Sequence, residues 1–588
     1  MMNKINKNYL MLVVIILIQV IYIACVFNVE KQGYHSDELW NYGFANSTEG
    51  KHVYSTDVGR EPKNCDEWVS TDVLRRYITV DKNEIFNYAA VYKNAANDYN
   101  PPLGYMLLHF VCSFFLGKWS KWYCFGLNLA CFIIMQIYIY KLARSVTKNE
   151  NAGLLSVFFF GFTAGACNIV VFLRIYAVAV MFGVMLLYYM HQLYEENNSG
   201  QWKLYLKIFL INILGCFTLN LFLPFAFIIT VMYCLYYLIS KKIKKFFAFG
   251  FMMLSSVTIS FAVFPSRISQ IIGDSNQLTY RAKSLSTIWQ NKIYWAYLTN
   301  DLFGVHNSIW KTMFWTYVLY GILIAAFFII PICFLVRKEE KYKQAKKKIK
   351  NVFMNLKNNI KYIQYTYIVM ICTVAFVVLI AAARTSTYAM GDCTTRYIFM
   401  IYPVMAVFAT TLSWKILSVI VKKAKIYNVI CVILCVVFSV LSIILSSHPY
   451  FFKHYEEGKT LTQLENNANC IIVTEETWLM TCYTCEIYNT QNYYVTNYDK
   501  ALQSDFKSDK INENDPLYLI LDMTYLDGNS SIENIIGRDN VIDEREKEEK
   551  HTSSELIEYF KKLNITASVE KVGADAVFGR NVNIYKLN

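Results

Sequence analysis

Long apolar runs limit the fold of this chain more than any other feature. About eleven of them approach the roughly 20 residues that a helix needs to cross a lipid bilayer. The chain is 55% hydrophobic and 17% charged, with a mean hydropathy of +0.28, which is far from the composition of a soluble domain. The sequence therefore predicts a mainly α-helical, polytopic membrane protein. The predicted spans begin near Tyr9, Trp122, Ala152, Ile175, Leu204, Leu221, Phe246, Thr312, Tyr362, Tyr397 and Tyr427.

The positive charges indicate how the chain is threaded through the membrane. The formal net charge is +13, but Lys and Arg cluster in short stretches between apolar runs, as the positive-inside rule requires, so no nucleic-acid partner is implied. Lys4 and Lys7 precede the first run, which places the N-terminus in the cytoplasm. The apolar segment from Leu103 to Leu116 is too short to cross. If it did cross, the later basic loops would all lie outside, so we expect it to lie along the outer surface.

This topology divides the chain into two expected domains. The membrane domain covers residues 1–446 and includes two extracytoplasmic loops, residues 30–121 and 265–311. Residues 447–588 are expected to form a small extracytoplasmic α/β domain, because short β-type runs alternate there with polar, helix-compatible stretches. The β-type runs begin at Cys470, Leu517 and Val582, and a helix is expected from Ser553 to Leu563.

Acidic residues stand directly after the first apolar run. The string GYHSDELW sets Asp37 beside Glu38 where a membrane helix should be ending, and DYNPPL places Asp98 ahead of two prolines. The prolines restrict the backbone and make a rigid corner that fixes where Asp98 points. The alternatives are a solvated acid pair at a helix end, and a device that starts a helix with Asn100 as its cap.

Arginines recur in turns on the same predicted side of the membrane. Arg174 lies in a tight turn between two spans, and Arg396 lies in the turn ahead of a later span. Arginine is suited to bidentate contact with phosphate, so acids and arginines on one membrane face would suit a lipid-linked phosphate. The alternative is an arginine that merely extends to the membrane interface. Other basic residues predicted on this side are Arg267, Arg281, Lys283 and Arg384.

At these residues the sequence resembles the C-type membrane glycosyltransferases, in particular the branch that contains protein O-mannosyltransferases and lipid A aminoarabinose transferases. The resemblance covers roughly the first three quarters of the chain, and its short motifs gain specificity from their order. The family commonly has His or Lys immediately before the two prolines, where this chain has Asn100. The motifs are Asp37 with Glu38, Asp98 ahead of Pro101 to Leu103, Arg174 with Tyr176, and Arg396 with Tyr397 and Pro403.

The resemblance implies an inverting glycosyltransferase. It would move a sugar from a polyprenyl-phosphate donor to an acceptor hydroxyl on the outer face of the cytoplasmic membrane. Asp37 is then the expected general base, which takes the proton from the hydroxyl, and Glu38 supports it. The phosphate leaving group needs charge stabilisation, which arginines supply. The expected substrate-binding residues are Asp98, Arg174, Tyr176, Arg396 and Tyr397.

A divalent metal ion is the one cofactor that these residues leave open. Its candidate ligands are Asp98, His35 and Glu38, which offer mostly oxygen atoms and one imidazole. The expected partners are a polyprenyl-phosphate-linked sugar, membrane lipid, and an acceptor that is a lipid, a polymer or a protein. The sequence does not distinguish between these acceptors.

Two other functions remain open at this stage. A flippase or transporter of lipid-linked sugars would carry ionisable residues or broken helices near the bilayer midplane, whereas here the polar residues gather at one face. An O-antigen-type ligase or polymerase also works on the outer face but would hold its main loop late in the chain. This chain carries its acids in the first predicted outer loop.

Overall fold

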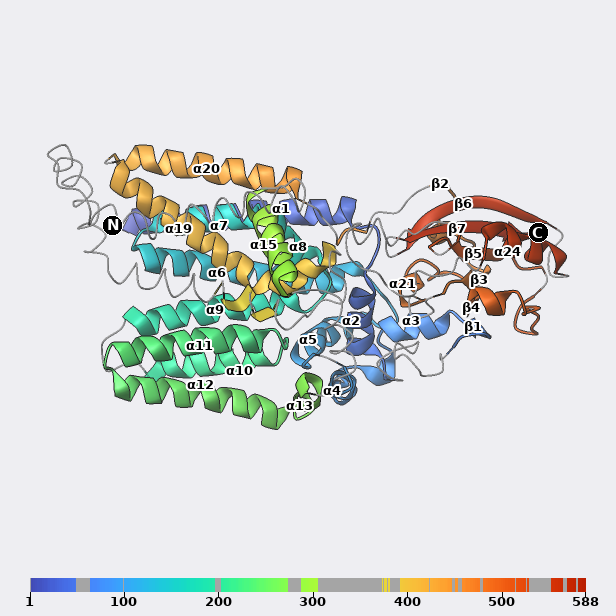
Figure 1. Ribbon diagram of the computed structural model, residues 1–588, viewed down its shortest axis with the longest axis horizontal. Coiled ribbons are helices and arrows are strands. Elements are labelled where there is room, and N and C mark those ends of the chain that lie inside the picture. Colours follow the sequence, from blue (N-terminus) through green and yellow to red (C-terminus); the bar gives the residue numbers. More distant parts are fainter. Residues whose placement is uncertain are drawn as a thin grey trace.

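A bundle of long helices forms one end of the molecule and a seven-stranded sheet forms the other (Figure 1). The chain begins at the bundle end and finishes in the sheet (Figure 1). The computed structural model describes residues 2–48, 64–98, 100–195, 202–272, 287–304, 373, 375–377, 379–380, 392–421, 423–446, 450–452, 457–475, 480–512, 514–524, 526–527, 551–563, 568–577 and 580–588.

Seven helices in the described residues are long and apolar enough to cross a membrane, and an eighth span is possible if a bent pair counts as one. The bent pair, α7 (Glu150–Gly161) and α8 (Ala164–Val171), turns by 63° at its break. The seven are Lys7–Glu30 of α1 (Met2–Glu30), α6 (Lys121–Thr147), α9 (Tyr176–Glu195), α11 (Phe222–Ile239), α12 (Ile243–Val263), Thr395–Ser418 across η2 (Asp392–Ile401) and α19 (Tyr402–Ile420), and α20 (Ala424–Leu445).

The prediction of a mainly helical, multi-pass membrane protein is confirmed at this level. The predicted span near Leu204 is α10 (Trp202–Cys216), whose 15 residues make it shorter than the seven. The predicted span near Thr312 lies outside the described residues, and the one near Tyr362 is described only at residues 373, 375–377 and 379–380, so the expected total of about eleven stays a prediction.

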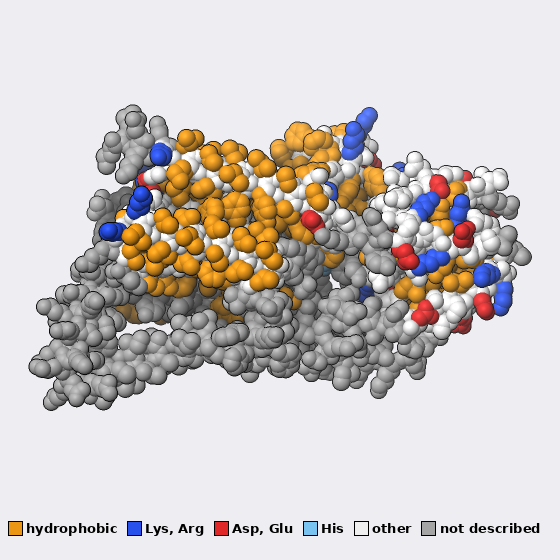
Figure 2. Space-filling model, turned by 90° about the horizontal axis from the view of Figure 1, so that it is seen from above, with side chains coloured by type: hydrophobic (Ala, Val, Ile, Leu, Met, Phe, Trp, Pro, Cys, Tyr) orange, Lys and Arg blue, Asp and Glu red, His pale blue; other side chains and the backbone are white. Residues whose placement is uncertain are grey.

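Hydrophobic side chains cover the described face of the bundle on the side of α20 (Figure 2). Viewed from the side of α20, they form a nearly continuous layer with Lys and Arg at its far end, whereas the sheet presents mixed acidic and basic side chains (Figure 2). Side chains of α20 such as Val429, Ile433 and Ile444 are 51%, 55% and 69% exposed. Exposed apolar side chains in such numbers are typical of a surface that faces lipid or another protein, which fits a membrane-spanning bundle.

Polar side chains start the helices that surround the candidate site. The hydroxyl of Ser120 accepts the amide proton of Trp122 at the start of α6, and Asn149 accepts two amide protons at the start of α7. Thr163 caps α8 in the same way, between the two halves of the bent pair. These caps satisfy amide groups that a helix start leaves unpaired, which lets the helices break inside an apolar bundle.

Short elements follow α1 and carry the acids. They are α2 (Ser36–Asn46), β1 (Trp68–Ser70), α3 (Asp72–Ile78), η1 (Lys82–Glu84), α4 (Tyr88–Ala96) and α5 (Leu103–Cys112). At ten residues α5 is too short to cross a bilayer, as predicted for this segment. Pro102 stands at its N-cap and no side chain caps it, so the alternative that made Asn100 the cap is wrong.

The sheet has the order β1-β4-β3-β5-β7-β6-β2. β3 (Asn469–Val473) pairs in parallel with β4 (Asn492–Thr496) and β5 (Leu517–Asp522), and the remaining pairs are antiparallel. All three predicted β-type runs form strands, and the predicted helix is α24 (Ser553–Lys562). The other elements are α21 (Met480–Tyr483), α22 (Tyr498–Ala501), β2 (Glu457–Gly458), η3 (Leu461–Gln463), β6 (Val569–Val577) and β7 (Arg580–Leu587).

The central strands β3, β4 and β5 are buried on both faces of the sheet. Ile471 and Val473 pack with α24 in one cluster, whereas Cys470 and Ile472 belong to the larger core that continues into the helices. This alternation follows from the two-residue period of a strand. The sheet and the bundle therefore share one core.

β1 joins this sheet from the segment after α2. Its residues pair with β4, and the indole of Trp68 donates to the carbonyl of Phe506 at 2.8 Å. Arg75 of α3 donates to the carbonyls of Tyr488 and Thr490, both at 2.7 Å. The first predicted outer loop therefore contributes a strand to the sheet of the C-terminal segment. The sequence did not predict this contact.

Candidate active site

α2 presents the two predicted acids at its first turn. His35 is its N-cap residue, and the imidazole Nδ1 accepts the amide proton of Asp37 at 2.9 Å. Glu38 reaches back and accepts the amide proton of His35 at 2.8 Å, which completes a capping box. The acids are therefore part of a defined helix start, and the two carboxylates point to different partners.

The side chain of Glu38 is buried, and both of its carboxylate oxygens accept hydrogen bonds from protein groups. Its oxygens accept from Lys31 Nζ at 2.7 Å and from the amide of Leu173 at 2.8 Å, and both side chains of the pair are 0% exposed. Sequence analysis missed Lys31, which stands seven positions before Glu38 at the end of the first apolar run. Glu38 is therefore a structural link between α1, α2 and the turn after α8, which is consistent with the expected supporting role.

Asp37 faces the arginines. Its Oδ2 lies 3.5 Å from Arg396 Nη2, and its side chain is 15% exposed. Burial would raise the pKa of this carboxyl, but the charges of Arg174 and Arg396 outweigh burial and hold the pKa below its usual range. Burial lowers the pKa of His35 to about 3, although Asp37 opposes that shift. Asp37 is therefore ionised and His35 neutral near neutral pH.

Arg174 lies in the turn between α8 and α9 and is only 6% exposed, so it does not extend to water as an interfacial anchor would. Its Nη1 donates to the hydroxyl of Tyr105 at 3.3 Å, and that hydroxyl donates to Asp98 Oδ2 at 2.9 Å. Its buried Nε has no hydrogen-bond partner within the described part of the chain. Arg174 is thus linked to Asp98 through Tyr105, and its positive charge also acts on Asp37. Its Nε remains available as a hydrogen-bond donor.

Arg396, Tyr397 and Tyr176 complete the set of predicted residues. The guanidinium carbon of Arg396 lies 4.9 Å from the ring centre of Tyr397, and its Nη2 donates to the Tyr397 hydroxyl at 3.3 Å. The ring of Tyr176 packs against Phe172 and Phe399, with centroids 5.7 and 5.8 Å away. The two arginine-bearing segments therefore meet through aromatic side chains.

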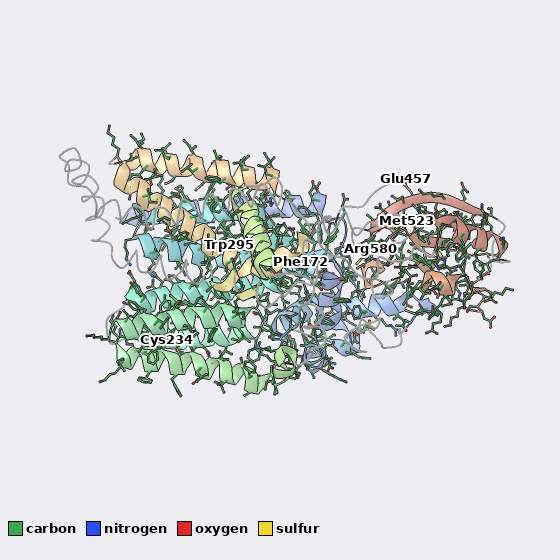
Figure 3. The ribbon with its side chains drawn as sticks, in the orientation of Figure 1. Phe172, Cys234, Trp295, Glu457, Met523 and Arg580 are labelled. Carbon is green, nitrogen blue, oxygen red and sulfur yellow. The ribbon has the colours of Figure 1, made fainter. Side chains whose placement is uncertain are left out.

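Tyr450 is a second residue that sequence analysis missed. Its ring packs on Phe172 at 4.5 Å, its hydroxyl contacts Thr395 Oγ1 at 2.7 Å, and its carbonyl accepts from Lys31 Nζ. Figure 3 shows Phe172 at the end of the bundle that faces the sheet, and Arg580 at the end of the sheet that faces the bundle. The predicted acids and arginines therefore gather where the bundle meets the sheet.

The candidate metal ligands do not gather in this way. No group of three or more His, Cys, Asp or Glu side chains suited to a metal occurs among the described residues. Glu38 already accepts from Lys31 and two backbone amides, and Asp98 accepts from Tyr105. These side chains do not form a protein-ligated metal site, and a divalent metal stays a prediction.

The other predicted basic residues have different outcomes. Arg267, at the start of α13 (Arg267–Ile272), is buried, donates to Asn220 Oδ1 at 3.1 Å and Ser260 Oγ at 2.9 Å, and also donates to the carbonyl of Cys216. The remaining three, Arg281, Lys283 and Arg384, lie outside the described residues.

Residues 99–268 match the family model for dolichyl-phosphate-mannose-protein mannosyltransferase. The chain resembles the C-type membrane glycosyltransferases. The match includes the two prolines, Arg174 and Tyr176, and it supports a membrane glycosyltransferase. A search of curated proteins found no match.

Two solved structures of this class are similar in outline. ArnT from Cupriavidus metallidurans, solved with bound undecaprenyl phosphate, shows 9% identity and a TM-score of 0.47, over 97% of each chain. The Archaeoglobus fulgidus oligosaccharyltransferase, solved with Zn and sulfate, shows 10% identity and a TM-score of 0.45, over 89% of this chain and 70% of that one.

Proposed function

We propose that this protein is an inverting glycosyltransferase that moves a sugar from a polyprenyl-phosphate donor to an acceptor hydroxyl. The observation that carries the proposal is the pairing of an ionised, partly exposed Asp37 with two arginines, the buried Arg174 and the partly exposed Arg396. A base beside a site for negative charge is what sugar transfer from a phosphate requires.

The proposed reaction is a single displacement. The acceptor oxygen attacks the anomeric carbon, and Asp37 takes the proton from that oxygen. The bond between the anomeric carbon and the phosphate oxygen breaks, and its electron pair leaves with the lipid phosphate. The new bond forms on the opposite face of the sugar, so the configuration at the anomeric carbon inverts.

The arginines have two roles in this proposal. Arg174 and Arg396 stabilise the charge that develops on the leaving phosphate, and the unpaired Nε of Arg174 offers a donor for it. They also keep Asp37 a weak base before substrate binds, because they lower its pKa. A bound phosphate would neutralise part of their charge, so the basicity of Asp37 would rise when the donor is in place.

The outer face of the cytoplasmic membrane is the proposed location of this site. The proposal is supported by the basic loops, which favour a cytoplasmic N-terminus and place the segment after α1 outside. Residues 1–446 are then the transferase domain, with outer loops 30–121 and 265–311, and residues 447–588 are an outer α/β domain. The acceptor is a cell-surface glycolipid, a polysaccharide or a protein.

The test uses purified full-length protein in liposomes with labelled polyprenyl-phosphate sugars, and follows the label into lipid, polymer and protein fractions. Removal of a general base lowers a rate by about 10²- to 10⁴-fold, so we expect Asp37→Asn to transfer sugar that much more slowly. Asp72→Asn is the matched control, because Asp72 is an exposed acid of the neighbouring α3.

Two results would contradict the proposal. The base assignment is wrong if Asp37→Asn transfers sugar as fast as the wild type. The transferase assignment itself is wrong if the wild type consumes no donor while labelled carrier crosses the bilayer, since that result is expected of a flippase.

A further inference from the structure

Two side chains of α2 form hydrogen bonds with the backbone of Leu173, the residue before Arg174. The amide of Leu173 donates to Glu38 Oε1 at 2.8 Å, and the carbonyl of the same residue accepts from Asn41 Nδ2 at 3.0 Å. Glu38 and Asn41 are three positions apart, so they lie on one face of the helix. Both polar groups of one residue are therefore bonded to the helix that also carries Asp37.

A third side chain, that of Asn128 in α6, forms hydrogen bonds with the same part of the backbone. Asn128 Nδ2 donates to the carbonyls of Val170 and Phe172, at 3.1 and 2.8 Å. Asn41 and Asn128 are 1% and 0% exposed, so neither asparagine has water as a substitute partner. We call Glu38, Asn41 and Asn128 the turn clamp.

The turn needs these bonds because it is irregular backbone inside an apolar bundle. The chain leaves α8 at Val171 and enters α9 at Tyr176, so the carbonyls between them lie outside a regular helical ladder. Buried carbonyls without a partner are costly, and irregular backbone at this depth persists only where protein groups satisfy it. The amide of Asn41 supplies a partner for the carbonyl of Leu173, and Asn128 adds a donor to the carbonyl of Phe172, which also accepts the amide proton of Arg174.

The clamp also decides where the guanidinium of Arg174 lies. Its one described side-chain hydrogen bond is the 3.3 Å contact with Tyr105, and the charges of Asp37 and Asp98 also act on it, so the place of the guanidinium depends on where its own backbone lies. The clamped residue is its immediate neighbour, Leu173. A shift of this turn away from α2 would carry Arg174 away from Asp37.

We propose that Asn41 and Asn128 are positioning residues that hold the Arg174 turn against α2 and so set the separation between the Arg174 guanidinium and the Asp37 carboxylate. This inference rests on the proposed function, in which those two groups act together. Neither asparagine contacts substrate in this account. Loss of either asparagine would misplace the Arg174 guanidinium and so slow sugar transfer, since displacements of about 1 Å can reduce turnover about 100-fold.

The proposal has a pH signature that a purely structural role would lack. Several groups from different elements bear on Asp37: Arg174 from the turn, Arg396 from η2, Tyr176 from α9, Cys482 from α21, and His35 from its own helix start. Of these, Arg174 contributes most to keeping the Asp37 pKa low. If the turn moves away, the Asp37 pKa rises and transfer is lost at a higher pH as the solution is acidified.

The experiment compares Asn41→Leu and Asn128→Leu with the wild type in the liposome transfer assay over a range of pH. Asn212→Leu is the matched control. Asn212 is equally buried and donates to Ser256 Oγ at 2.6 Å between α10 and α12, away from the turn. Asn41→Ser keeps a hydroxyl donor and replaces Asn41→Leu if the leucine variant does not fold.

We expect both clamp variants to lose at least about tenfold in turnover, with the acid limb of the pH profile moved to higher pH. Deuterium exchange in the peptide that contains Leu173 and Arg174 should be faster in both variants than in the wild type. Asn212→Leu should keep the wild-type turnover per folded molecule, the wild-type pH profile and the wild-type exchange in that peptide.

The inference is overturned if the clamp variants keep the wild-type pH profile, or if exchange of the Leu173 peptide does not change. A wild type that transfers no sugar would instead refute the proposed function. The exchange measurement needs no substrate, so it would still decide whether the asparagines hold the turn.

Discussion

The buried pair of Lys31 and Glu38 makes the sharpest prediction for stability. The substitution Lys31→Met keeps an unbranched side chain and removes only the ammonium group. It leaves Glu38 buried among apolar side chains, with the amides of His35 and Leu173 as its remaining described partners. The carboxylate would then be an uncompensated charge in a site that water does not reach.

The expected magnitude follows from the burial of the pair. Both side chains are 0% exposed, and breaking such a pair by removal of one partner costs about 3–5 kcal/mol in the free energy of unfolding. Burial raises the pKa of Glu38, and Lys31 is the strongest of the groups that oppose this. Without Lys31 the pKa rises further, so the carboxyl binds a proton more readily. The loss of stability should therefore be largest at high pH and should shrink as pH falls.

The assay is unfolding in mixed micelles titrated with a denaturing detergent, at several pH values. Lys31→Met with Glu38→Gln should recover part of the loss, because it removes the uncompensated charge. Lys148→Met is the control, since Lys148 pairs with Glu195 at the surface, where its side chain is 63% exposed and such pairs contribute about 0–1 kcal/mol. The reasoning fails if Lys31→Met is no more destabilising than Lys148→Met, or if its effect does not depend on pH.

Three other substitutions test different parts of the structure. Arg396→Gln removes the 3.5 Å partner of Asp37 and raises the pKa of that carboxyl, so transfer should be lost at a higher pH than in the wild type as the solution is acidified. Gly43→Ala should destabilise by about 1–3 kcal/mol in the same unfolding assay, because its Cβ would lie 1.8 Å from Tyr77 Cζ. Arg75→Met removes the Arg75 donor to the carbonyl of Tyr488 and one of two donors to the carbonyl of Thr490, and should increase proteolysis of the first loop, with a cost of about 1–3 kcal/mol.

The substitutions at Gly43 and Arg75 each have a control variant. Gly126→Ala should be tolerated, because nothing lies within 4 Å of the new Cβ. Arg76→Met removes an exposed arginine adjacent to Arg75 and should leave proteolysis unchanged. For Arg396→Gln, an unchanged pH profile would mean that this arginine does not control the basicity of Asp37.

Composition and periodicity were sufficient to predict most of the fold. Apolar runs of spanning length and β-type runs depend on neighbouring residues, so a single sequence shows them, as at α20 and β5. The three-residue strand β1 was missed because so short a run carries no periodic signal. Its strand character comes from pairing with β4, which lies far along the chain.

The candidate site was predictable in its residue types but not in its contacts. Asp37, Arg174 and Arg396 stood out because charges beside apolar runs are unusual. The resemblance implied that Asp37 is the base and Glu38 its support, but the contacts that hold Glu38 were not visible in the sequence, because they come from Lys31 and from the amide of Leu173, 135 positions away. Polar side chains that bond backbone, such as Asn41, leave no pattern in the sequence.

The pairing of β1 with β4 places a constraint on biosynthesis. Trp68 and Tyr494, its partner in β4, are 426 residues apart, so the strand is synthesised long before the sheet that receives it. At about 5–20 residues per second, translation leaves this edge strand waiting for roughly 20 to 90 s, while the intervening membrane helices are inserted. During that interval its backbone groups have no sheet to pair with, so chaperone demand should be greatest before the last quarter of the chain emerges.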